Sequence, residues 1–265
     1  MALTVLVIAV LLRPFQISAV QALEGYWRNR FWLSPIESLA IERHIRRASI
    51  ASANMLEIPM RSAASEFHLV ATQARHEARV QRRMNDAEAV VEQYPRQVSW
   101  VLPTLLGNVL RAAEKSAGER YGLDTVTTYP RLYPYLSPRL HQETATQLNV
   151  IDTASSIAII VGLLAAVSTP LAVRIDGWSI APVALALVSV VSYRGARIAA
   201  GRYGLLLRAA FDLHRFDMLT GMHRRLPVDA NDEYTENAAL GRVLAGERPI
   251  DDPGPRRWRY SHPKP

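Results

Sequence analysis

The chain has 265 residues, of which 49% are hydrophobic and 21% charged, and its formal net charge is +7. It contains no cysteine, which excludes disulfide bonds, thiolate catalysis and cysteine-ligated zinc. A basic chain can bind nucleic acid, but arginines beside apolar segments are the ordinary mark of the cytoplasmic side of membrane proteins. We therefore attribute the positive charge to membrane topology and expect no nucleic-acid partner.

The first predicted element is a transmembrane helix over residues 1–23. Met1–Leu12 is uncharged, but its length is only about 18 Å as a helix, against about 30 Å for a bilayer core. Two interpretations are open: one tilted helix through residues 1–23 with Arg13 reaching the interface, or a longer span that begins before this sequence does. Four aromatic residues follow, as at a membrane interface: Tyr26, Trp27, Phe31 and Trp32.

Residues 24–152 are predicted to form a helical cytoplasmic region. Ser34–Glu37 is a capping box with proline at the first helical position, so a helix is expected from Ser34 to about Leu56. A second helix is expected over 60–92, with an alanine-rich stripe that suits packing on the neighbouring helix or on a coiled-coil partner. A third is expected over 99–117.

The next segment is predicted to be non-helical. Thr125–Tyr129 is β-branched and aromatic, which favours an extended strand too short to build a sheet. Tyr129–Leu136 contains two prolines among its tyrosines and is interpreted as a rigid loop.

Residues 153–200 are predicted to form a transmembrane hairpin. Thr153–Val173 and Trp178–Tyr193 contain no charged residue and are separated only by Arg174–Gly177. Apolar stretches of this length predict membrane-spanning helices. The first is expected to begin at Ser137-Pro138, with serine as the N-cap. Because neither stretch contains an ionisable residue, a proton relay or coupled transport is not supported.

The remainder divides into residues 201–226 and 227–265. The former is predicted to be an amphipathic juxtamembrane helix that continues the span or lies along the interface. The latter is predicted to be a mostly disordered tail with one short helix over 232–244. Arginines flank the hairpin on one side, which places residues 24–152 and 194–265 in the cytoplasm and the N-terminus outside.

These elements define an all-α helical membrane protein with a transmembrane hairpin, an N-terminal span and a helical cytoplasmic domain. Arginine greatly outnumbers lysine, and with abundant Ala, Val and Leu this indicates a GC-rich bacterial genome. The expected location is therefore the bacterial inner (plasma) membrane.

One polar cluster is a candidate site. Its residues are Asn108, Arg111, Glu114, Arg120, Asp124 and Arg131. It is interpreted either as an ion-paired junction that holds the cytoplasmic helices against the membrane face, or as a pocket for an anionic headgroup or nucleotide. No catalytic residue, cofactor or metal ligand is predicted; His68 and His76 lie eight residues apart on a helix and are interpreted as surface residues.

Part of the chain resembles a known group. The segments are Pro103–Glu114, Arg120–Asp124, Tyr129–Leu132 and Leu207–Asp217. They are similar to a block in uncharacterised bacterial, mostly actinobacterial, integral membrane proteins, and the resemblance covers about residues 100–225. It implies a membrane topology and carries no activity.

Two functions of different classes are expected from these features. The first is a membrane-anchored scaffold that binds the lipid bilayer and either another copy of itself or a protein partner on the cytoplasmic side. The small residues of the hairpin would let helices of two copies approach closely: Gly162, Ala165, Ala166 and Ser168. The alternative is a membrane-permeabilising effector or pore-forming oligomer, and a weaker alternative is a lipid-acting enzyme that uses Arg111 to Arg131.

Overall fold

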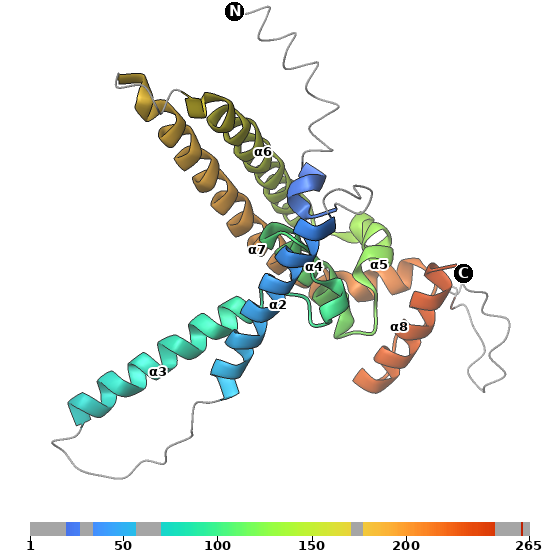
Figure 1. The fold of residues 1–265 in the computed structure, drawn as a ribbon. Coiled ribbons are helices and arrows are strands. Elements are labelled where there is room, and N and C mark those ends of the chain that lie inside the picture. The colour runs from blue at the N-terminus through green and yellow to red at the C-terminus, as the bar shows by residue number, and fades with distance from the viewer. Residues whose placement is uncertain (1–19, 27–33, 57–69, 171–176, 247–260, 262–265) are drawn as a thin grey trace, which may run out of the picture. The chain divides into compact units, whose positions relative to one another are not determined.

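The structure is a computed structural model that describes residues 20–26, 34–56, 70–170, 177–246 and 261 (Figure 1). These residues form α-helices and short 3-10 turns, with no β-strand among them. The chain divides into two compact units. The α2–α3 unit is Gln21–Ala112, and the α6–α7 unit is Ala113–Pro265 with Met1–Val20. Most of the predicted first span, most of the hairpin turn and nearly all of the tail beyond Gly246 lie outside the described residues.

The α2–α3 unit is built on two helices that pack on each other. The helix α2 (Ser34–Leu56) begins at the predicted capping segment, and α3 (Val70–Val91) ends just before Tyr94-Pro95. Ala51 and Ala87 are buried, and Nδ1 of His44 lies 3.0 Å from the Tyr94 hydroxyl. Ala87, near the end of α3, therefore packs on the neighbouring helix of the same chain, whereas Ala78, earlier in the predicted stripe, is exposed.

The third predicted helix is divided in two. A 3-10 turn, η2 (Val98–Trp100), precedes α4 (Leu105–Glu119). The chain between them turns at Pro103, and a buried asparagine, Asn108, bonds to the backbone of that turn. The boundary between the two units falls within α4, after Ala112.

The prediction of an extended segment over 125–129 is wrong, and so is the loop over 129–136. These residues form the helix α5 (Thr125–Leu132) and the 3-10 turn η3 (Tyr133–Tyr135). The Asp124 carboxylate accepts a hydrogen bond from the Thr127 N–H at 3.0 Å and caps α5. Thr128 and Leu132 are fully buried. Capping and burial therefore override the β-branched propensity of the local sequence.

The α6–α7 unit contains the two longest helices. The helix α6 (Pro138–Ser168) begins at the predicted N-cap, where the Ser137 hydroxyl accepts from the Leu140 N–H. After the turn η5 (Gly177–Ile180), α7 runs from Ala181 to Gly221. Both are long and apolar enough to cross a membrane. The 41 residues of α7 extend for about 60 Å, so the second arm of the predicted hairpin and most of the predicted juxtamembrane segment are one continuous helix.

The helices α6 and α7 lie side by side and run in opposite directions (Figure 1). The Ser137 N–H lies 3.4 Å from Nε2 of His214, and the Ser189 hydroxyl donates to the Ala158 carbonyl at 2.7 Å. Gly162 and Ala165 belong to this contact rather than to an exposed face: a Cβ on Gly162 would lie 2.9 Å from the Ser189 Oγ, and Ala165 is buried. These two small residues therefore pack within the α6–α7 pair of the same chain, whereas Ala166 is exposed.

The hydrophobic core of this unit lies at the ends of α6 and α7 remote from η5. Its fully buried side chains come from four helices and include Leu132, Leu207, Phe211, Met218 and Leu240. The last of these belongs to α8 (Ala230–Leu244), whose N-cap is Asp229. The predicted short helix near the C-terminus is thus confirmed, and it packs into the core.

Candidate functional site

The six polar residues predicted to form one cluster are divided between the two units. Asn108 and Arg111 belong to the α2–α3 unit, and Glu114, Arg120, Asp124 and Arg131 belong to the α6–α7 unit.

Asn108 supports the backbone at the start of α4. Its side chain is fully buried, accepts from the Leu102 N–H at 2.7 Å and donates to the carbonyls of Leu102 and Thr104, both at 2.8 Å. These bonds satisfy buried polar groups of the turn, and they leave the amide occupied by the protein's own backbone.

The neighbours of Asn108 hold Glu24 and Tyr26 against α4. A Cβ on Gly107 would lie 1.9 Å from the Glu24 carbonyl oxygen, so only glycine permits this approach. Arg111 donates to the Tyr26 hydroxyl at 3.3 Å, and its guanidinium lies 5.7 Å from the centre of that ring. Both residues therefore join α4 to the segment that follows the predicted first span.

In the α6–α7 unit, Asp124 and Arg131 stabilise α5. Burial tends to raise the pKa of Asp124, but hydrogen bonds from Thr127 and the charge of Lys115, whose Nζ lies 3.3 Å away, outweigh it. The pKa of Asp124 is therefore below its ordinary value. Arg131 donates to the Thr127 carbonyl, one turn earlier in the same helix.

Arg120 and Glu114 complete the predicted set. Arg120 lies 3.6 Å from the Asp212 carboxylate on α7, and both side chains are substantially exposed. Glu114 is half-buried on α4. The described contacts are thus an ion pair to α7 for Arg120, a helix cap and an ion pair for Asp124, and a hydrogen bond within α5 for Arg131.

A second polar arrangement joins α7 to α8 and was missed by sequence reasoning. We call it the α7–α8 seam; its residues are Tyr121, Arg215, Arg224, Glu233, Glu236 and Asn237. Arg215 lies 2.6 Å from Glu233, and Arg224 lies 3.2 Å from Glu236. The Asn237 amide donates to the Tyr121 carbonyl at 2.9 Å. The spacing of Glu233, Glu236 and Asn237 on one helical face was the signal available in the sequence.

Tyr121 links this seam to α7 in two further ways. Its hydroxyl donates to Asp212 at 2.6 Å, and its ring lies 4.0 Å from the Arg215 guanidinium. Burial, followed by the hydrogen bond to Asp212, raises the pKa of Tyr121. The tyrosine therefore stays protonated at neutral pH, as the donor role requires.

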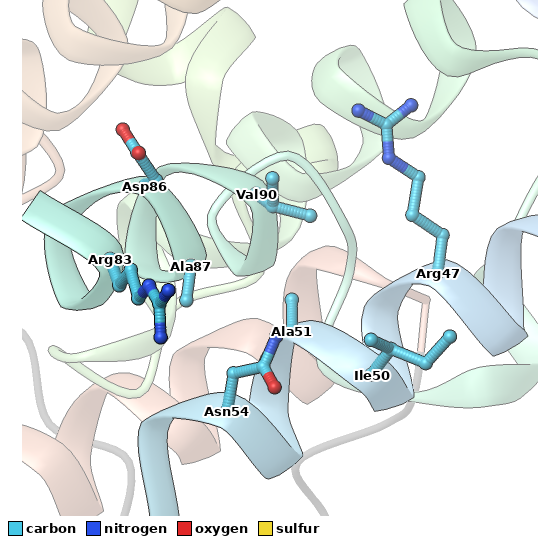
Figure 2. Close-up of a pocket in the computed structure, with 8 residues that line it drawn as sticks. All are labelled: Arg47, Ile50, Ala51, Asn54, Arg83, Asp86, Ala87 and Val90. Carbon is cyan, nitrogen blue, oxygen red and sulfur yellow. The ribbon is translucent and has the colours of Figure 1, made fainter. Parts of the chain in front are cut away.

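The α2–α3 unit contains a concave site, which we call the α2–α3 groove. It has a volume of about 580 Å³ and is lined by Arg47, Ile50, Ala51, Asn54, Arg83, Asp86, Ala87 and Val90 (Figure 2). The two buried alanines lie between the helices, and Arg47 and Arg83 extend from opposite helices. None of these eight residues belongs to the predicted cluster.

The outer surfaces of α6 and α7 near η5 form a third feature. Within residues 157–167 and 183–191, every exposed residue is Ala, Ile, Leu or Val. On α6 these are Ile157, Ile160, Leu163, Leu164, Ala166 and Val167. On α7 they are Val183, Ala184, Ala186, Leu187, Val188, Val190 and Val191. We call this surface the apolar band.

Neither a search for metal ligands nor a comparison with known proteins identifies a further site. In the described part of the chain, no three His, Asp or Glu residues are close enough together to hold a metal ion, and His68 and the side chain of His76 lie outside that part. No protein-family model, curated protein or solved structure matches the chain.

Proposed function

We propose that the protein is a membrane-anchored scaffold. In this proposal α6 and α7 cross the bilayer as a hairpin, and the other described helices form a partner-binding region in the cytoplasm. The observation that carries the proposal is a reversal of surface character along one helix, α7.

The first half of α7 has its apolar residues outside, as part of the apolar band. The second half has them inside: Ala196, Ala199, Ala200, Gly204, Leu207, Ala210, Phe211, Met218 and Leu219 are buried. Its exposed positions mix aliphatic residues with charged ones such as Arg202, Asp212 and Asp217. An outward apolar surface suits lipid, whereas an inward core with charges outside suits water.

The helix α6 supports the same division. Its first half buries Leu140, Thr144 and Ile151 and exposes polar residues such as Gln142 and Glu143. Its second half contributes to the apolar band. Because α6 and α7 run in opposite directions, both reversals fall at the same level of the helix pair, as one membrane surface requires.

The proposed orientation follows from arginine. Arg194, Arg197 and Arg202 lie at or just beyond the reversal in α7, and the predicted turn between the spans contains one arginine and one aspartate. The positive-inside rule therefore favours the bacterial inner membrane with the α7–α8 seam in the cytoplasm. Residues 1–23 would add a third crossing with the N-terminus outside.

The proposed role is binding rather than catalysis. Arg111 donates to the Tyr26 hydroxyl and Arg131 to the Thr127 carbonyl, so each has a partner within its own unit, which favours a structural role over a lipid-acting one. A pore-forming role is not favoured either, since the apolar band offers no polar side chain to line a water-filled channel. The α2–α3 groove is the concave surface that a partner can occupy.

Membrane extraction and partner recovery test this proposal. Full-length protein expressed in bacteria should remain in membranes washed with alkaline carbonate, and it should co-purify after mild detergent extraction with a second copy or a partner. Leakage of dye from vesicles that contain the protein should stay at the background rate. Release by carbonate, a monomer that captures nothing, or rapid leakage would contradict the proposal.

A further inference from the structure

The α2–α3 groove has the geometry of a seat for a third helix. Its lining residues on α2 are 47, 50, 51 and 54, and those on α3 are 83, 86, 87 and 90. Both sets follow the spacing i, i+3, i+4, i+7, which is one face of a helix over two turns, or about 10 Å. The groove is therefore flanked on both sides by complete helical faces of equal length.

The shape of the groove favours a helix over a flat surface as its ligand. Ala51 and Ala87 are buried and short, so they form a low floor, while Ile50 on one rim is 53% exposed. A convex helix can place apolar side chains on such a floor and cover Ile50 and Val90. A bilayer surface is flat on this scale and cannot fill the concavity.

The charges of the groove indicate the chemistry of the occupant. Arg47 and Arg83 are exposed, and neither makes an ion pair with any residue that the structure describes. Asp86 is the one carboxylate among the lining residues, and Figure 2 shows its carboxylate and the Arg83 guanidinium pointing in different directions. Two cations on opposite rims are thus available to carboxylates of a ligand.

We infer that the α2–α3 groove binds an acidic amphipathic helix of a partner protein. The apolar stripe of that helix lies on Ala51 and Ala87, and glutamates or aspartates on its two flanks pair with Arg47 and Arg83. This inference rests on the proposed partner-binding function and names the class of partner.

A second copy of α2 fits the surface less well. The exposed residues next to the groove include Arg43 and Arg46, three residues apart on the helix. Antiparallel pairing of two α2 helices that places Leu39 against Ile50 also places Arg43 against Arg46 of the other copy. Like charges at the centre of a helix pair oppose association.

Two synthetic helical peptides test the inference on the full-length protein in neutral-lipid nanodiscs. Both carry the same stripe of leucine and alanine at i, i+3, i+4 and i+7; one is flanked by glutamates and the other by lysines. Fluorescence anisotropy should show about tenfold or greater preference for the glutamate peptide.

The variant R47E/R83E should reverse this preference, and the control R46E/R82E, with the same charge change on the same helices, should keep it. Circular dichroism should show equal helix content in all three proteins.

Several results would overturn the inference. One is equal binding of the two peptides, and another is an equal effect of the two double variants. Either result would show that Arg47 and Arg83 do not specifically recognise the peptide. Self-association that R47E/R83E abolishes would identify a second copy as the occupant, and binding to phosphatidylglycerol vesicles that R47E/R83E abolishes would identify a lipid surface. If the peptides fail while the intact protein still recovers a partner, the groove assignment fails and the scaffold proposal stands. Protein released from membranes by carbonate refutes the scaffold proposal whatever the peptides do.

Discussion

Arg215 and Glu233 form the closest ion pair between α7 and α8, with Nε and Oε1 separated by 2.6 Å and side chains only 15% and 10% exposed. Removing one partner of a buried pair leaves the other charge without compensation. We expect Glu233→Gln to lower the free energy of unfolding by about 3 kcal/mol. Thermal or denaturant unfolding of the detergent-solubilised protein measures the loss.

An exposed ion pair between α8 and the segment that follows α7 is the control. Arg225 lies 3.4 Å from Asp232, but its side chain is 71% exposed. Arg225→Gln should therefore change the free energy of unfolding by less than about 1 kcal/mol. If Glu233→Gln and Arg225→Gln have equally small effects, Arg215 and Glu233 do not hold α8 in place.

The contact between α6 and α7 can be tested by an engineered disulfide. A Cβ on Gly162 would lie 3.7 Å from the Ser189 Cβ, within the range that disulfides require. Because the chain contains no cysteine, the double variant Gly162→Cys, Ser189→Cys has no competing thiol. Mild oxidation should give an intramolecular disulfide, seen as a faster monomer band on a non-reducing gel.

Leu164→Cys with Ser189→Cys is the matched control, because Leu164 belongs to the apolar band and is exposed. This pair should remain reduced within the monomer. A disulfide-linked dimer from the Gly162 variant would show that the small residues of α6 meet another copy instead of α7.

Gly107 tests the approach of Glu24 to α4. Gly107→Ala places a methyl group 1.9 Å from the Glu24 carbonyl oxygen, so the backbone must shift, at a cost of about 1–3 kcal/mol in stability. Gly201→Ala is the control, since a Cβ there meets nothing within 4 Å, and alanine should stabilise α7 by up to about 1 kcal/mol. The approach of Glu24 to α4 is wrong if Gly107→Ala unfolds no more easily than Gly201→Ala.

Asp124 makes the stability of α5 dependent on pH. Because its pKa is lower in the folded protein than in the unfolded chain, its contribution is present above the unfolded pKa of 3.8 and is lost as the pH falls through the folded value. Asp124→Asn keeps a capping side chain and should remove this acid dependence, whereas Asp124→Ala should cost about 1 kcal/mol at pH 7. Unfolding curves between pH 7 and pH 3 measure both effects; an identical acid dependence in wild type and Asp124→Asn would refute the assignment.

Local signals predicted those parts of the fold that depend on neighbouring residues. The starts of α2 and α6 were predictable because a serine followed by proline specifies an N-cap within one turn. The failure at α5 has the opposite cause. Its threonines favour a strand locally, and the helix depends on the Asp124 cap and on burial of Thr128 and Leu132 by the rest of the unit.

Contacts between distant segments could not be predicted from the sequence. The pairing of Arg215 with Glu233 requires the turn between α7 and α8, which no local pattern specifies. Gly107 is another such case, since its requirement for glycine comes from the Glu24 carbonyl more than eighty residues earlier in the chain. The six candidate residues were grouped because they are close in sequence, but the sequence could not predict their partners: Asn108 bonds to the backbone of its own turn, and Arg120 pairs with Asp212 on α7.

The central claim is that α6 and α7 cross the membrane with the α7–α8 seam in the cytoplasm. Gly177, in the turn before α7, and Val228, beyond the other end of the proposed span and 79% exposed, lie on opposite sides of the membrane in this account. Each is replaced singly by cysteine in the cysteine-free chain and treated with a membrane-impermeant maleimide. Gly177→Cys should be labelled in intact spheroplasts and Val228→Cys only in inverted vesicles. Labelling of both positions from the same side would contradict the account.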